Sequence, residues 1–122
     1  MAFLVLATVA TPAIADVGET RPARWPGFKR SFHVTKRDVQ PHGATPQLAA
    51  GRYTFEMSGG RQVADLYVRV GDKPSKEGFT CRPFVDGADE RCEITLARPA
   101  VIYWIIMTGL PTIDVVLEAK QL

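Results

Sequence analysis

Residues 64–70 read ADLYVRV, and the alternation within this stretch decides the fold class. Its even-numbered residues are apolar, so they fall on one face of an extended chain and predict a half-buried β-strand. The outward residues are Asp65, Tyr67 and Arg69. The turn sequence GDKP at 71–74 then ends the strand.

Further strand signals flank this stretch on both sides. Arg52–Met57 and Ile113–Ala119 alternate in the same way, while Phe79–Phe84 and Cys92–Leu96 are shorter candidates. Ala100–Thr108 (AVIYWIIMT) is apolar on both faces, which predicts a central strand covered on both sides. Strand signals about every ten residues, separated by glycine and proline turns, predict an all-β fold, a small antiparallel β-sandwich.

Length and composition set the class of protein around these strands. The chain has 122 residues, of which 46% are hydrophobic and 23% charged, with a net charge of +2. This is enough for one small domain and is typical of neither disordered nor fibrous chains. No apolar run approaches the ~18 residues of a membrane span, so we expect no mature span.

The N-terminus resembles an export signal. An apolar stretch over 2–10 is followed by Thr11-Pro12 and by Ala13-Ile14-Ala15, the small–x–small pattern of a cleavage site. We therefore expect residues 1–15 to be a signal peptide and the protein to be secreted or periplasmic. The alternative is a buried N-terminal strand, since no lysine or arginine precedes the apolar run.

Residues 16–47 are rich in proline and glycine, which predicts an irregular basic arm. Six basic residues and no acidic one lie between Arg21 and Arg37, interleaved with aromatic residues. Such a segment could contact an anionic envelope polymer; nucleic acid is disfavoured for an exported protein. The favoured alternative docks the aromatics on the domain, with Lys29–Val34 as an edge strand.

Cys81 and Cys92 are the only two cysteines. In an oxidising compartment an even count predicts a disulfide, worth roughly 3 kcal/mol for so short a loop. A zinc site would need more ligands at closer spacing, and a catalytic thiol would need a histidine from the irregular N-terminal region.

Several motifs occur in the order found in one family of secreted modules. They are the glycine–aromatic pattern at 51–55, SGG at 58–60, ADLYVRVG at 64–71, CRPF at 81–84 and ERC at 90–92. Residues 48–122 thereby resemble the bacterial pre-peptidase C-terminal domain, here as a stand-alone secreted member. The resemblance implies a jelly-roll-like β-sandwich with a Cys81–Cys92 disulfide and an accessory role without catalysis.

The sequence offers two candidate sites. Asp65, Tyr67 and Arg69 form a candidate binding face, although cross-strand packing and a pairing of Asp65 with Arg69 explain them as well. Asp86, Asp89 and Glu90 place carboxylates on a tight turn, as calcium requires, and the alternative is a solvated loop.

No nucleophile elbow, zinc-protease or phosphate-loop motif occurs, and we predict no enzyme activity. We therefore expect a non-catalytic extracytoplasmic module that binds a secreted protein or an extracellular polysaccharide on one sheet face. The alternative is a stand-alone regulator of a secreted protease, as inhibitor or chaperone.

Overall fold

The computed structural model describes residues 24–59, 63–83 and 87–122, and within them the chain forms strands and loops without a helix. The predicted signal peptide lies outside the described residues. The strands are β1 (Phe28–Thr35), β2 (His42–Ala44), β3 (Gly51–Ser58), β4 (Asp65–Val70), β5 (Glu90–Leu96), β6 (Ile102–Met107) and β7 (Thr112–Gln121).

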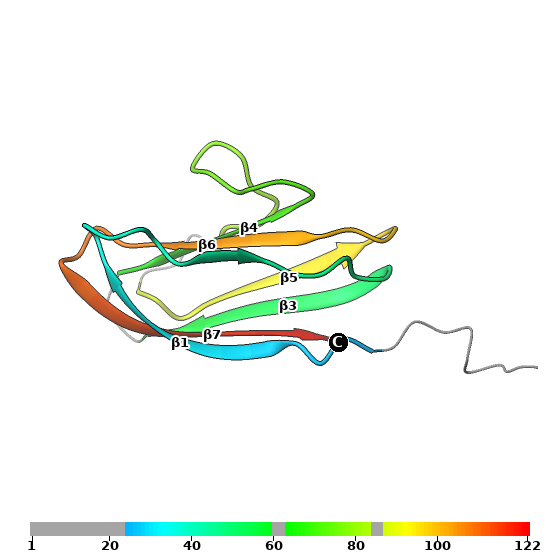
Figure 1. The fold of residues 1–122 in the computed structure, drawn as a ribbon, viewed down its shortest axis with the longest axis horizontal. Helices are drawn as coiled ribbons and strands as arrows, with labels where there is room; N and C mark the ends of the chain where they lie inside the picture. Colours follow the sequence, from blue (N-terminus) through cyan, green and yellow to red (C-terminus); the bar gives the residue numbers. More distant parts are fainter. Residues whose placement is uncertain (1–23, 60–62, 84–86) are drawn as a thin grey trace, which may run out of the picture.

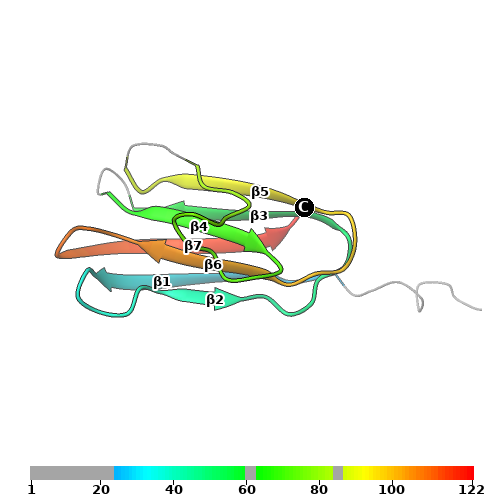
Figure 2. The same cartoon turned by 90° about the horizontal axis from the view of Figure 1, so that it is seen from above.

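The strands form two stacked antiparallel sheets (Figure 1). The four-stranded sheet has the order β1-β7-β3-β5, and the three-stranded sheet has the order β2-β6-β4. Odd-numbered strands therefore lie in one sheet and even-numbered strands in the other, so every connection crosses between the layers (Figure 2). The predicted all-β, jelly-roll-like sandwich is confirmed.

The core lies between the sheets and follows the two-residue period of the sequence. Strand β7 buries its odd-numbered residues from Ile113 to Ala119, and β3 buries Tyr53, Phe55 and Met57. Strand β6 is the central strand of its sheet, as predicted, and Trp104 on it is 2% exposed. Its outer face is only half-buried, which corrects the prediction that both faces are covered.

The predicted irregular arm over 16–47 is wrong for two segments that form strands. Strand β1 pairs with β7 along its whole length, from Phe28 opposite Ala119 to Thr35 opposite Thr112. Strand β2 pairs with β6, where Gly43 lies against the indole of Trp104. The edge strand considered for Lys29–Val34 is confirmed, and the sandwich includes strands before the predicted boundary at 48.

Aromatic packing explains why a proline-rich segment pairs so regularly. The rings of Phe28 and Phe32 lie 5.9 and 5.6 Å from the Trp104 ring, and Trp25 lies 6.0 Å from Tyr53. Burying these rings against the second sheet outweighs the weak strand propensity of the flanking prolines, which lie outside the strands.

Candidate functional site

The outer side of β4 carries the three residues of the predicted binding face, and the following loop covers its centre. Tyr67 is 5% exposed, with the ring of Phe79 at 5.8 Å and the guanidinium of Arg82 at 5.2 Å from its centroid. Asp65 contacts Arg82 at 3.3 Å, in place of the expected pairing with Arg69. A ligand therefore cannot stack on Tyr67 in this structure.

Arg69 also contacts the loop that follows β4, because its guanidinium donates to the Lys73 carbonyl at 3.3 Å. The outward side chains of β4 thus attach residues 71–83 to the sheet. The predicted strand over Phe79–Phe84 is wrong for its described residues, which form only an isolated bridge between Cys81 and Val68.

Strand β4 is an edge strand, and three of its backbone N–H groups donate to residues outside its sheet. The Leu66 N–H donates to Glu90 Oε1 at 2.7 Å, the Val68 N–H to the Cys81 carbonyl at 3.0 Å, and the Val70 N–H to Thr80 Oγ1 at 2.9 Å. Unpaired edge groups invite association with other chains, so this cap protects the sheet.

The disulfide predicted between Cys81 and Cys92 is present, with 5.9 Å between the Cα atoms. Cys81 belongs to the segment that caps β4, whereas Cys92 lies on β5 of the opposite sheet. The bond therefore links the two layers at the edge where the cap lies.

Among the described residues, Glu90 is the buried side chain that can carry a charge as a carboxylate. It is 4% exposed, on the core side of β5 with Cys92 and Ile94, and bridges the sheets through Leu66. Burial raises the pKa of Glu90 to about 6, and the charge of Asp65 adds to this, whereas Leu66 and Arg82 act in the opposite direction.

The predicted calcium ligands do not come together in the described part of the chain. Asp89 points to the backbone N–H of Gly59, which donates to it at 2.9 Å, while Glu90 points into the core. Asp86 lies outside the described residues. No group of three metal-ligating side chains occurs among residues 24–59, 63–83 and 87–122.

The two histidines, and the two carboxylates of β5, do not come together in one site. His33 pairs with Asp114 at 2.7 Å on the four-stranded sheet, whereas His42 lies on β2. Glu93 points outward on β5 while Glu90 points inward, so these two carboxylates cannot flank one cleft.

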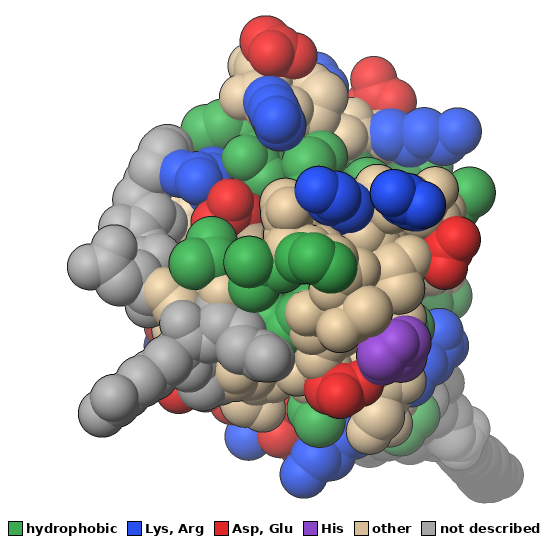
Figure 3. Space-filling view, turned by 90° about the vertical axis from the view of Figure 1, so that its left-hand side faces the viewer, with side chains coloured by type: hydrophobic (Ala, Val, Ile, Leu, Met, Phe, Trp, Pro, Cys, Tyr) green, Lys and Arg blue, Asp and Glu red, His purple; other side chains and the backbone are tan. Residues whose placement is uncertain are grey.

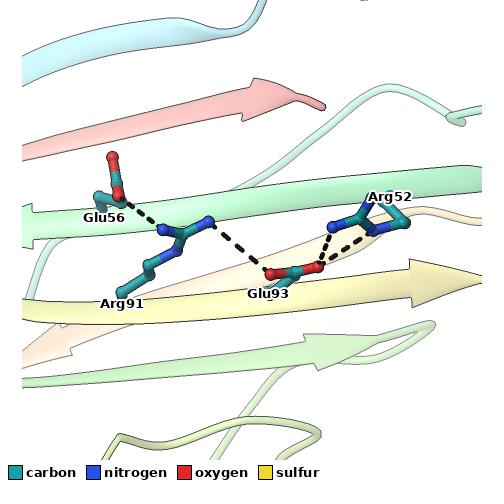
Figure 4. Close-up of polar contacts among 4 residues, drawn as sticks. All are labelled: Arg52, Glu56, Arg91 and Glu93. Carbon is teal, nitrogen blue, oxygen red and sulfur yellow. Dashed lines mark hydrogen bonds and ion pairs between the residues drawn. The ribbon is translucent and has the colours of Figure 1, made fainter.

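The outer face of β3 and β5 carries a ladder of ion pairs (Figure 4). Glu93 accepts from Arg52 at 2.7 Å and lies 3.7 Å from Arg91, which lies 3.7 Å from Glu56. The Arg52 hydrogen bond lowers the pKa of Glu93. The charged side chains on this part of the face are thus paired with one another.

The outer face of the three-stranded sheet is different. A groove of about 500 Å³ runs over β6, with Tyr103 and Ile105 beneath it, His42 on the β2 side and Lys73-Pro74 on the loop side. A smaller hollow of about 300 Å³ adjoins it at Gln40 and reaches Met107. Figure 3 shows the adjacent end of the sandwich, where hydrophobic side chains are bordered by both basic and acidic side chains.

Sequence reasoning missed this groove. The signal was present in the Ala100–Thr108 run, whose apolar outer residues predicted a covered face. The structure leaves that face open, because β2 is only three residues long and the loop after β4 reaches only one side of it.

Together these features define a two-layer β-sandwich, closed at one edge by a disulfide-linked cap and open along β6. No family model matches the chain. Among curated proteins it is similar to the neutral protease of Vibrio proteolyticus, with 31% identity over 74 residues, 61% of this chain and 12% of that protein. It is also similar to alkaline serine exoprotease A of Vibrio alginolyticus, with 45% identity over 61 residues, 50% of this chain and 11% of that protein.

A third relative is the extracellular protease of Xanthomonas campestris, with 38% identity over 68 residues, 56% of this chain and 11% of that protein. The chain thus spans about a tenth of these relatives, and the similarity lies in their C-terminal regions. The solved structure titled "Solution structure of vEP C-ter 100" aligns over 81% of this chain and 82% of that one, at 23% identity. Its TM-score of 0.43 is too low to support a conclusion about the fold. No helix in the described ranges is long and apolar enough to cross a membrane.

Proposed function

We propose that the protein is a non-catalytic, extracytoplasmic accessory module of the pre-peptidase C-terminal type, which binds a protein or polysaccharide. The observation that carries the proposal is the confinement of the similarity to about a tenth of each protease. Relatives that match this segment include, by their printed names, a zinc metalloprotease of Helicobacter pylori as well as the serine exoprotease, which supports a role separate from either catalytic chemistry.

The groove over β6 supports a binding role and replaces the face expected around Tyr67. It lies on the same sheet, within the size range of ligand sites, and Tyr103 and Ile105 on it are half-buried. The opposite sheet presents paired charges whose contribution to binding an apolar partner is small.

The test is retention of the purified chain on insoluble collagen, elastin, chitin and cellulose. We expect retention on at least one of these, lost in Ile105→Ser and kept in Val116→Ser, a half-buried residue on the outer face of the other sheet. Retention on none of these together with no binding to soluble peptides, or hydrolysis of labelled casein by the purified chain, contradicts the proposal.

A further inference from the structure

We infer that the groove over β6 binds an extended polypeptide segment, which places apolar side chains on Tyr103 and Ile105 and an acidic side chain at Lys73. The inference rests on the proposed function, because it names the class of ligand for the same groove. A polysaccharide is the competing occupant, and three features of the groove favour polypeptide.

The first feature is the spacing of the floor. Tyr103, Ile105 and Met107 are alternate residues of β6, all half-buried on its outer side, and they continue from the groove into the adjoining hollow. Alternate residues of a strand are about 7 Å apart, and an extended peptide has the same repeat. Successive apolar side chains of such a peptide can therefore contact successive floor residues in register.

The second feature is that two polar side chains of the groove are already engaged by the protein itself. The Gln40 amide donates to the carbonyls of Thr35 and Asp38 and accepts from the Thr108 N–H, so its hydrogen-bonding capacity is used within the protein. His42 Nδ1 is occupied by the Gln40 carbonyl at 3.0 Å. A sugar ring loses hydrogen bonds to water on binding and needs replacements, whereas apolar side chains do not.

The third feature is charge. Lys73 is exposed on the loop side of the groove, and the described residues that line the groove include no aspartate or glutamate. Lys36 and Lys76 line the adjoining hollow, where Asp38 and Asp65 balance their charge. Within the groove itself the charged side chain among the described lining residues is therefore Lys73, which favours an acidic side chain of the ligand at this point.

The probes are two fluorescein-labelled heptapeptides of alternating leucine and serine, one with glutamate at both ends and the other with lysine, measured by fluorescence anisotropy. We expect the wild-type chain to bind the glutamate peptide more tightly. Lys73→Glu should weaken that binding at least about fivefold and strengthen binding of the lysine peptide. Lys120→Glu, the same charge change on the other sheet, should leave both unchanged.

Ile105→Ser should weaken both peptides alike, whereas Val116→Ser should weaken neither; melting temperatures confirm that each variant is folded. Equal binding of the two peptides by the wild-type chain, or binding insensitive to Ile105→Ser, overturns the inference. Retention on chitin or cellulose without peptide binding overturns it too but leaves the proposed function standing. Binding to neither peptides nor polymers overturns both.

Discussion

Glu90→Gln should stabilise the protein at alkaline pH relative to acidic pH. The folded chain holds this carboxyl in the core, with its Oε1 accepting from Leu66 and with Asp65 and Arg82 nearby. A glutamine keeps an oxygen acceptor for the Leu66 N–H but carries no charge. The substitution therefore removes the cost of a buried charge while keeping the bridge between the sheets.

The size of the effect follows from the pKa. Raising the pKa of Glu90 from its ordinary 4.5 to about 6 corresponds to about 2 kcal/mol, since one pKa unit is about 1.4 kcal/mol. Between pH 4.5 and 6 the folded chain binds more protons than the unfolded chain. The Glu90 contribution to stability is therefore complete below pH 4.5 and lost as pH rises through 6.

Urea denaturation at intervals from pH 4 to 8 measures this directly. The free energy of unfolding of Glu90→Gln minus that of wild type should rise by about 2 kcal/mol across the range. Glu93→Gln is the matched control on the same strand, and its trend has the opposite sign, because Arg52 lowers the pKa of Glu93. A flat or falling difference for Glu90→Gln would mean that folding does not raise the pKa of Glu90.

Three further predictions concern stability and use urea denaturation at pH 7. Replacing Cys81 and Cys92 together by serine should cost about 3 kcal/mol, since the bond closes a short loop across a sequence separation of 11; a loss below about 0.5 kcal/mol contradicts this. Gly27→Ala should cost about 1–3 kcal/mol, because φ is 73° and a Cβ would collide with the Ala119 carbonyl, whereas Gly109→Ala, which meets open space, should cost under about 1 kcal/mol; equal losses would exclude this cause. Leu117→Ala should cost about 2–5 kcal/mol and Val116→Ala under about 1.5 kcal/mol, and the reverse order would contradict the assigned faces of β7.

The two-residue alternation of apolar residues was enough to predict most of the strands. The alternation in 64–70 and in 113–119 predicted strands whose inward faces are confirmed, because burial of one face fixes the register of a strand. The irregular arm was wrong because proline and glycine content describes local preference only. Phe28 and Phe32 acquire their partner, Trp104, from a segment about seventy residues away in the chain.

The candidate site was harder to predict, for a related reason. Alternation correctly placed Tyr67 outward from the sheet, but an outward side chain is exposed only where nothing covers it. The loop carrying Phe79 and Arg82 covers Tyr67, while the apolar outer face of β6 lies open beside it. Glu90 likewise looked like a loop carboxylate, because the strand period that directs it inward begins at that residue.

We propose that the module meets its partner at the open face of β6. An amide chemical-shift titration of the isotopically labelled chain with the glutamate-ended heptapeptide tests it most directly. Shifts should concentrate at 39–44, 73–74 and 103–107. Shifts concentrated on the outer face of β1, β7, β3 and β5, or around Asp65 and Tyr67 alone, would contradict it.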